Sequence, residues 1–272
     1  MKQALTIAGS DSSGGAGIQA DLKTFHAHGV FGASVLTAVT AQSTRAVGEV
    51  LTLPPALIVA QLDAVLDDLD IAAAKTGMLS SADVIDAVAG ALSARRFSTL
   101  VVDPVMISKS GYRLLQDDAV GALRNRLLPL ALVATPNLHE AGLLAGMQIA
   151  SLVDMRRAAE HIAGLGPRAV VVKGGHASFA LATDVLFMDG TVEELRPDSV
   201  VEERSIHGTG CAFSAAIAAE LALGESVPSA VRRAKRYITR AIRQAPAVGS
   251  GHPPAHHFYF LEPGDWDVEP GV

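Results

Sequence analysis

The segment His207-Gly208-Thr209-Gly210-Cys211 has the residue types that bind a negatively charged group. Its two glycines stand directly before a segment rich in small residues, which is typical of a helix start. The first backbone N–H groups of a helix have no partner within the helix, so they favour an anion at that position. The segment therefore predicts an anion-binding turn.

Other interpretations of this segment fit less well. A dinucleotide-binding fingerprint would need a third glycine at the position that Phe213 occupies. A cysteine hydrolase would need a histidine beside Cys211, and His207 lies four residues away on the far side of the turn. A plain helix start would need neither the two glycines nor the cysteine.

Two acidic residues follow strand-like runs and could bind a metal ion. Asp103 ends one run, and Glu140 lies one helical turn beyond Thr135-Pro136-Asn137, which follows the next run. Together they could hold Mg²⁺ through carboxylate oxygens and waters. For Glu140 alone, an acid stabilised by the positive end of a helix is the simpler explanation; the pair favours the metal.

Glycines and a lysine follow two further runs. Residues 9–17 hold four glycines but match neither a Walker A loop nor G-x-G-x-x-G. They form either a flexible turn or a close approach of backbone to a ligand. Lys173 precedes Gly174 and Gly175, so it could meet a phosphate or lie on the surface before a turn.

The elements that would position these residues alternate along the chain. Short aliphatic runs, each followed by glycine, proline or small polar residues, predict buried strands at residues 4–8, 34–39, 71–75, 99–103, 130–134 and 169–173. Longer amphipathic segments separate them, which predicts a mostly parallel sheet with helices on both faces. Ligands of such sheets bind beyond the carboxyl ends of the strands.

Apolar residues spaced by three or four predict helices over residues 58–69, 84–92 and 152–165. Pro54-Pro55 would open the first helix. Ser80 before Asp83 and Ser151 before Asp154 resemble capping boxes that would open the other two. Residues 185–187, 192–195 and 200–203 are expected as short strands near a sheet edge, followed by helices over 210–223 and 227–243 and an irregular tail from about 246.

Composition excludes several classes of protein. Of the 272 residues, 49% are hydrophobic and 18% charged, which excludes a disordered chain. A net charge of −6 without a basic tract argues against nucleic acid as a partner. The single cysteine excludes an internal disulfide. With no long apolar run and no signal-like N-terminus, we expect a cytoplasmic protein of one domain, residues 1–272, without a membrane span.

Several sequence blocks resemble the hydroxymethylpyrimidine/phosphomethylpyrimidine kinases of thiamin biosynthesis, in the ribokinase-like superfamily. The blocks are residues 8–11 and 17–25, 40–44, 75–79, 103–106 and 109–111, 135–137 with Glu140, 172–176 and 207–211. They occur in the same order and cover nearly the whole chain. The resemblance implies an α/β fold, a three-layer α/β/α sandwich around a mostly parallel sheet.

The resemblance also implies where the substrates bind. The pyrimidine would lie among Gly9, Asp21, Gln42, Met78, Val105 and Cys211. Asp21 and Gln42 would bind the ring amine and nitrogens, and Met78 and Val105 would form apolar walls. Ser43 stands where the family pattern has asparagine.

On the ATP side, the resemblance places Lys173 and Thr209 near the phosphates and Lys235 near the nucleotide. Asp103 and Glu140 would hold Mg²⁺, and residues 208–211 would form the anion hole for the transferred phosphoryl group. In the tail, Pro253 stands where the family pattern has glycine, which bears on the expected contact between the tail and the nucleotide.

The implied reaction transfers phosphate from ATP to the hydroxymethyl group of the pyrimidine and then to the resulting monophosphate. Such transfer needs positioning and charge stabilisation, which a helix start, a magnesium pair and a lysine supply. Cys211 stands where sugar kinases of the superfamily carry an aspartate, and we expect it to let one site accept both alcohol and monophosphate. We also expect a homodimer.

Two other functions are consistent with parts of the sequence. A pyridoxal or pyridoxine kinase of the same superfamily would share the glycine–cysteine turn, but Gln42 and Met78 favour the pyrimidine. A ligand-sensing protein on an inactive kinase fold would not need Asp103, Glu140 and Lys173 together.

Overall fold

A nine-stranded sheet forms the centre of the molecule, with strand order β3-β2-β1-β4-β5-β6-β7-β8-β9. The computed structural model describes residues 1–107, 111, 114–116, 119–175, 177–197 and 206–261. The strands are β1 (Gln3–Asp11), β2 (Phe31–Gln42), β3 (Val47–Thr52), β4 (Ile71–Thr76), β5 (Leu100–Val102), β6 (Val133–Ala134), β7 (Ala169–Val172), β8 (Asp184–Met188) and β9 (Thr191–Leu195). Strands β2, β1, β4, β5, β6 and β7 run parallel, whereas β3, β8 and β9 are antiparallel additions at the edges.

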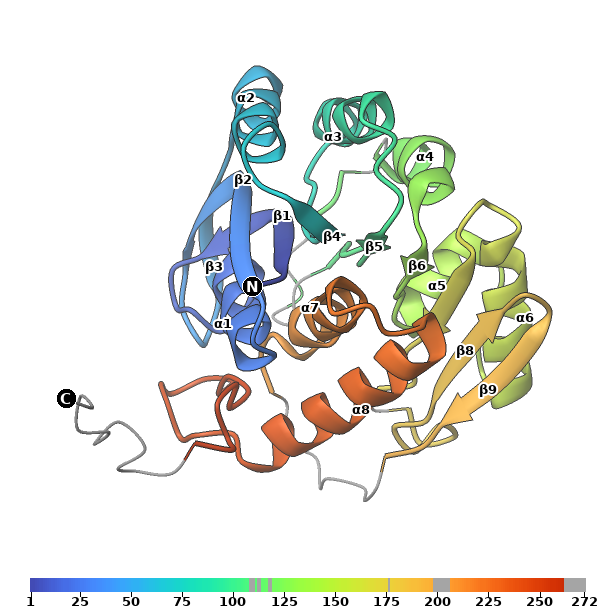
Figure 1. Cartoon of the computed structure of the whole chain (residues 1–272). Helices are drawn as coiled ribbons and strands as arrows, with labels where there is room; N and C mark the ends of the chain where they lie inside the picture. The colour runs from blue at the N-terminus through green and yellow to red at the C-terminus, as the bar shows by residue number, and fades with distance from the viewer. Residues whose placement is uncertain (108–110, 112–113, 117–118, 176, 198–205, 262–272) are drawn as a thin grey trace.

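Helices cover both faces of the sheet (Figure 1). One face carries α1 (Gly17–Ala27), α7 (Thr209–Ala222) and α8 (Val227–Arg243). The other carries α2 (Pro55–Leu66), α3 (Ala82–Ala94), α4 (Ala119–Ala122), α5 (Leu138–Ala145) and α6 (Leu152–Ala163), with the π-helical and 3₁₀ turns η1 (Leu123–Leu127) and η2 (Leu128–Leu130) after α4. This arrangement confirms the expected three layers around a mostly parallel sheet.

Alternate residues of each central strand point into two separate apolar cores. Leu5 and Val102 pack into the core under α2–α6, and their neighbours Ala4 and Val101 pack into the core under α1, α7 and α8. Because both faces of the sheet are buried, the strands are aliphatic throughout rather than alternating with polar residues. Helix α7 is buried along its whole length after its first turn, and its many alanines let it pack close to the sheet.

The predicted strands are present, with different bounds. Strand β1 extends to Asp11, whereas the run at 130–134 forms a strand only at Val133–Ala134, because the chain turns through η2 before it. Strand β3 was not predicted. The expected strand at 200–203 lies outside the described residues. Those described in the tail, 246–261, form no helix and take part in one isolated bridge, Pro254 to His207.

The helix starts follow the predicted caps with one exception. Ser151 caps α6 and Pro55 opens α2, as predicted. Ser80 does not cap α3: the cap is Ser81, whose hydroxyl accepts from Val84 N, while the Ser80 hydroxyl lies 2.9 Å from the Thr52 hydroxyl. Among the described residues, no helix combines the length and the apolar character needed to cross a bilayer.

Candidate active site

A cavity of about 770 Å³ lies at the carboxyl ends of the central strands. The chain order along the sheet reverses between β1 and β4, which is where ligands of open α/β sheets bind. Almost all the predicted site residues line this cavity: Gly9, Gln42, Met78, Asp103, Val105, Glu140, Lys173, Gly208, Thr209, Gly210, Cys211 and Lys235. The structure therefore brings residues that are far apart in the sequence into one place.

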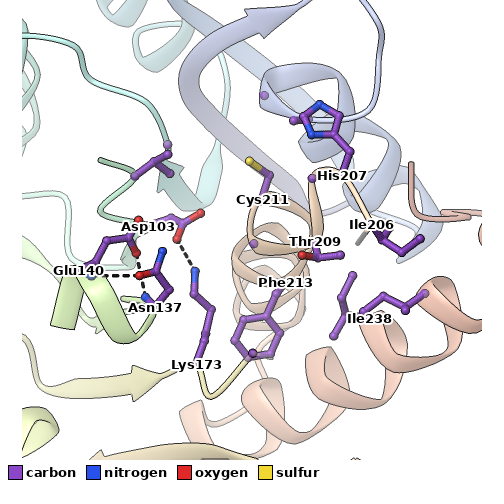
Figure 2. A pocket seen from close by; sticks show the side chains of 18 of the residues that line it. Asp103, Asn137, Glu140, Lys173, Ile206, His207, Thr209, Cys211, Phe213 and Ile238 are labelled. Atoms are coloured by element: carbon purple, nitrogen blue, oxygen red, sulfur yellow. Dashed lines mark hydrogen bonds and ion pairs between the residues drawn. The ribbon is translucent and has the colours of Figure 1, made fainter. Parts of the chain in front are cut away.

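The first turn of α7 faces the cavity, with Cys211 near its centre (Figure 2). Gly208 precedes the helix with φ of 75°, a left-handed conformation that favours glycine. A Cβ atom on Gly208 would lie 1.8 Å from Gly15 O, so the helix start packs directly against the loop after β1. This packing fixes the free N–H groups of the helix start relative to the cavity.

A lysine and an aspartate form an ion pair beside this helix start. Lys173 Nζ lies 2.8 Å from Asp103 Oδ1, and Asp103 also accepts from the Thr135 and Ser214 hydroxyls. Burial acts to raise the pKa of Asp103, but the positive charges of Lys173 and Lys75 outweigh it and lower the pKa. Asp103 is therefore an ionised carboxylate at the centre of the site.

Glu140 is held at the start of α5 by a capping box. Its Oε2 accepts from Asn137 N at 2.8 Å, and the Asn137 side chain accepts from Glu140 N at 2.9 Å. Burial raises the pKa of Glu140 to about 7; Lys173 acts against this rise and Asp103 adds to it. Glu140 is thus an acid at a helix start, as the simpler explanation has it, and its side chain also lines the cavity.

Asp21 lies elsewhere than we expected. Its side chain is wholly buried and does not line the cavity. Asp21 Oδ2 accepts from Lys75 Nζ at 2.8 Å and from the Thr6 hydroxyl at 2.6 Å, and it is Lys75 that lines the cavity. Burial acts against the charge on Lys75, but Asp21 outweighs it and raises the pKa of Lys75.

The thiol of Cys211 is a neutral group in this environment. Burial raises the pKa of Cys211 to about 11, and although Lys75 acts to lower it, Asp21 and Asp103 add to the rise. The helix start does not offset this rise, because burial and the two carboxylates oppose a thiolate.

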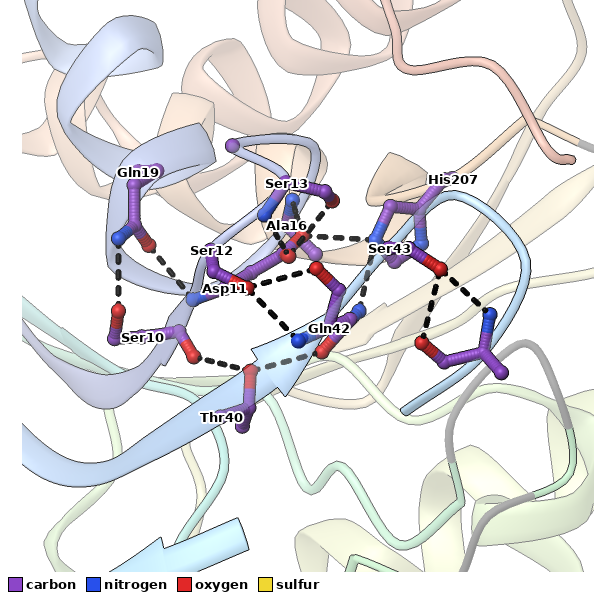
Figure 3. A network of polar contacts seen from close by, with 12 residues as sticks. Ser10, Asp11, Ser12, Ser13, Ala16, Gln19, Thr40, Gln42, Ser43 and His207 are labelled. Carbon is purple, nitrogen blue, oxygen red and sulfur yellow. Dashed lines mark hydrogen bonds and ion pairs between the residues drawn. The ribbon is translucent and has the colours of Figure 1, made fainter. Parts of the chain in front are cut away.

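Gln42 belongs to a polar network that the sequence did not reveal (Figure 3). Its side-chain amide lies 3.0 Å from His207 Nε2, which lies 2.9 Å from Asp11 Oδ2. Burial acts to raise the pKa of Asp11, but hydrogen bonds from His207 and Ser13 outweigh it and lower the pKa to about 2. The signals were the position of Asp11 at the end of β1 and of His207 directly before Gly208.

The opposite end of the cavity is more apolar. Phe213 of α7 and Ile238 of α8 line it (Figure 2), and Lys235 lines the cavity one turn before Ile238 on α8. Lys235 Nζ donates to Asp184 Oδ2 and to Ala182 O, each at 2.6 Å. Lys235 is therefore held by α8 against the loop before β8.

Part of the tail lies near Gln42. His252 N donates to Thr44 O at 2.8 Å, and Pro253 O accepts from His207 N at 2.9 Å. Ser43 forms part of the turn between β2 and β3, where its N donates to Ala46 O. The described part of the tail thus contacts the β2–β3 turn and also α8, where His256 N donates to Ala241 O at 3.0 Å; its expected contact with the nucleotide stays a prediction. His176 and Lys109-Ser110 of the sequence blocks lie outside the described residues.

Comparisons with known proteins agree with this geometry. A family model described as phosphomethylpyrimidine kinase matches residues 11–256. A hydroxymethylpyrimidine/phosphomethylpyrimidine kinase of Rhizobium meliloti is 54% identical over 94% of this chain and 97% of its own length. Among solved structures, the ADP complex of Bacillus subtilis pyridoxal kinase has a TM-score of 0.88 at 40% identity and covers 96% of this chain and 98% of its own. A phosphomethylpyrimidine kinase of Clostridium difficile has a TM-score of 0.80 at 45% identity, covering 89% of this chain and 100% of its own.

Proposed function

Since the chain belongs to the phosphomethylpyrimidine kinase family, we propose that it uses ATP to phosphorylate 4-amino-5-hydroxymethyl-2-methylpyrimidine and then the resulting monophosphate, in thiamin diphosphate biosynthesis. The observation that carries this proposal is that residues expected to bind the pyrimidine and residues expected to bind ATP line one cavity. It is lined by Gln42 and Met78, by Lys235 and Ile238 of α8, and by the start of α7.

The centre of the cavity is suited to phosphoryl transfer. Such transfer has little covalent chemistry for the protein to do and depends on positioning and on stabilising negative charge. The N–H groups at the start of α7 and the ammonium group of Lys173 would face the transferred phosphoryl group. Thr209, at the first position of the helix, would lie beside the same phosphates.

The pyrimidine would bind at the Gln42 end. Gln42 would pair with polar ring atoms, while Met78 and Val105 would enclose the ring. Gly9 has a direct reason to be glycine, since a Cβ atom there would lie 2.4 Å from Met78 Cε. Lys75, placed by Asp21, supplies a positive charge on the same side.

The carboxylates of Asp103 and Glu140 fit a magnesium ion that keeps most of its waters. No group of three or more His, Cys, Asp or Glu among the described residues could hold a metal by itself. Mg²⁺ in kinases is commonly bound by one or two carboxylates together with substrate phosphates, so a larger protein cage is not needed. Asp103 and Glu140 would hold it, and it would neutralise charge on the phosphates.

The neutral thiol of Cys211 suits a site that takes two substrates. The second substrate already carries an ionised phosphate near the helix start, and a carboxylate at position 211 would repel it. A phosphate oxygen needs no general base before it attacks. For the alcohol, a thiol with a pKa of about 11 is a poor base, so positioning carries the first step.

A substrate panel tests this proposal against a pyridoxal kinase, which the similarity to the Bacillus subtilis enzyme makes the second candidate. ATP consumption would be measured with the pyrimidine alcohol, its monophosphate, pyridoxal and pyridoxine. We expect turnover of both pyrimidines, with kcat/KM above that for pyridoxal. Turnover of pyridoxal alone would assign the second function, and no turnover of any alcohol would favour a ligand sensor. The cytoplasmic location and the homodimer stay predictions.

A further inference from the structure

The network around His207 determines which atoms of this imidazole carry hydrogen (Figure 3). Asp11 accepts from Ser13 N and the Ser13 hydroxyl at Oδ1, and from Ala16 N at Oδ2. An ionised carboxylate can only accept hydrogen bonds. The 2.9 Å contact between Asp11 Oδ2 and His207 Nε2 therefore requires a hydrogen on Nε2.

That hydrogen restricts the amide of Gln42. The Gln42 amide nitrogen would face His207 Nε2 at 3.0 Å, and its oxygen would face the Thr40 hydroxyl at 3.3 Å, in one of its two orientations. Two donors would then face each other at His207. The oxygen and nitrogen of a carboxamide have nearly the same shape and are told apart by their partners, so the oxygen belongs on the His207 side.

The contact at Thr40 gives the same answer independently. The Thr40 hydroxyl donates to Ser10 O at 2.7 Å, and a hydroxyl has one hydrogen to donate. Toward Gln42 it can therefore only accept, which requires the amide nitrogen at that end. With its nitrogen toward Thr40, the amide donates to the Thr40 hydroxyl. With its oxygen toward His207, the single hydrogen on Nε2 is shared between Asp11 Oδ2 at 2.9 Å and the amide oxygen at 3.0 Å, a three-centre hydrogen bond.

We propose that His207 is a positioning residue: held by Asp11, it locks the Gln42 amide with its oxygen toward the imidazole and thereby sets the donor–acceptor order offered to the pyrimidine. This inference rests on the proposed function. An aminopyrimidine has a donor amine beside an acceptor ring nitrogen, the same kind of edge that glutamine binds with both amide atoms in adenine. A rotated amide would present the reverse order and lose part of this recognition.

The apolar end of the cavity should not be affected by this lock. Lys235 donates to Ala182 O and Asp184 Oδ2 beside β8, whereas Gln42 ends β2, which lies far from β8 in the strand order. Loss of the lock should therefore raise the KM for the pyrimidine without raising the KM for ATP.

Two substitutions at one position separate the lock from simple packing. His207→Leu removes the side-chain donor and keeps an apolar group of similar size. His207→Gln keeps an N–H group at about the same reach. His161→Leu is the matched control, because His161 is exposed on α6 and does not line the cavity.

Steady-state kinetics with the pyrimidine alcohol and ATP test the lock. We expect His207→Leu to raise the KM for the pyrimidine about tenfold, the effect of one hydrogen bond, with kcat and the KM for ATP within about twofold of wild type. His207→Gln should recover most of the loss, and His161→Leu should match wild type. An equal loss in the leucine and glutamine variants, or an equal rise in the KM for ATP, would overturn the proposal.

Nitrogen-15 NMR of the wild-type protein tests the same lock without substrate and without a variant that could fail to fold. We expect the His207 imidazole to carry hydrogen on Nε2. A neutral imidazole with its hydrogen on Nδ1 in an enzyme that turns over the pyrimidine would refute this inference alone. A wild-type enzyme without pyrimidine turnover would refute the proposed function instead.

Discussion

At the scale of single residues, the two side chains expected to bind the pyrimidine have different roles. Gln42 lines the cavity, whereas Asp21 is buried behind Lys75 and holds its ammonium group. In the proposed function Gln42 would bind the substrate directly, whereas Asp21 would act through Lys75. Substitution of each should therefore give a different result.

We expect Gln42→Ala to raise the KM for the pyrimidine by about one to two orders of magnitude, because polar ring atoms lose their partner, with little change in Tm. Asp21→Ala leaves the buried charge of Lys75 unpaired and should cost about 3–5 kcal/mol of stability. Thermal unfolding and the KM values of both variants check this. An unchanged Tm for Asp21→Ala would show that its bond to Lys75 does not stabilise the fold.

Glu140 should make the stability of the protein depend on pH. Its pKa of about 7 lies above the ordinary value of 4.5, so the folded state holds a proton that the unfolded state releases. The resulting stabilisation is complete below about pH 4.5 and is lost as the pH rises through about 7. As the pH rises from about 5 to about 8, the free energy of unfolding should therefore fall less in Glu140→Gln than in wild type.

Urea titrations across that pH range measure this difference, and Mg²⁺ supplies a control within the wild type. A cation beside the carboxylate favours its ionised form. Added Mg²⁺ should therefore reduce the loss in wild type and leave Glu140→Gln unaffected. Equal pH dependence of the two proteins would contradict the raised pKa.

Cys211→Asp tests why a thiol stands at the start of α7. A carboxylate there would repel the ionised phosphate of the second substrate at a cost of about a few kcal/mol. We expect kcat/KM for the monophosphate to fall at least about tenfold more than kcat/KM for the alcohol. Cys211→Ala removes a neutral group and adds no charge, so it should change the two reactions to a similar extent. If Cys211→Asp also lowered both reactions in parallel, the thiol would have a packing role only.

At the scale of elements, the start of α7 is positioned by two glycines that do different work. Gly208 allows the left-handed turn and the contact with the loop before α1, whereas a Cβ atom on Gly210 would lie 3.3 Å from Lys173 Nζ. Gly208 thus serves the packing of the helix start, and Gly210 keeps room for the lysine.

We expect Gly210→Ala to lower kcat by about an order of magnitude while Tm stays near that of wild type, because the methyl group displaces Lys173 and not the backbone. Gly208→Ala should lower both, since its Cβ would lie 1.8 Å from Gly15 O and the left-handed conformation costs about 1–2 kcal/mol. Circular dichroism melts and turnover of the two variants provide the comparison. A stable Gly208→Ala protein with wild-type turnover would rule out this account of the turn.

The elements themselves were largely predictable because both faces of the sheet are buried. Aliphatic runs such as the one at β7 cannot belong to a half-exposed element. Strand β3 was missed because its residues are exposed or half-buried and are placed by pairing with β2, which a local pattern does not contain. The cap of α3 was misplaced by one residue because two serines stand side by side.

The site was predictable in its residue types but not in its pairings. Nearly every residue that the resemblance assigned to the site lines the cavity, whereas lining residues such as Phe213 and Ile238 were not predicted. The contacts of Lys75 with Asp21 and of His207 with Asp11 join residues 54 and 196 positions apart. Such pairings depend on how β1, β4 and the start of α7 pack together. The sequence shows the partners only as separate motifs, so it does not predict the contacts.

At the scale of the whole molecule, the described part of the tail, residues 246–261, returns to the site. The tail passes between the β2–β3 turn and the segment before α7. Gly251 N donates to the Thr44 hydroxyl, Arg45 Nε donates to the Ser250 hydroxyl, and Pro253 O accepts from His207 N. The tail thus ties the strand that carries Gln42 to the residue that orients it.

Gly251→Ala should loosen this tie at a distance from both substrates. Its Cβ would lie 2.2 Å from Thr44 O, so the tail must move away from the β2–β3 turn. Gly90→Ala is the matched control, since a Cβ there meets nothing within 4 Å and alanine favours the helix by about 1 kcal/mol. Because Gln42 and His207 share the support of the tail, Gly251→Ala should raise the KM for the pyrimidine several-fold and leave the KM for ATP unchanged. If the KM for ATP rose instead, the tail would serve the nucleotide, as the family pattern first suggested, and its contacts at Thr44 would be incidental.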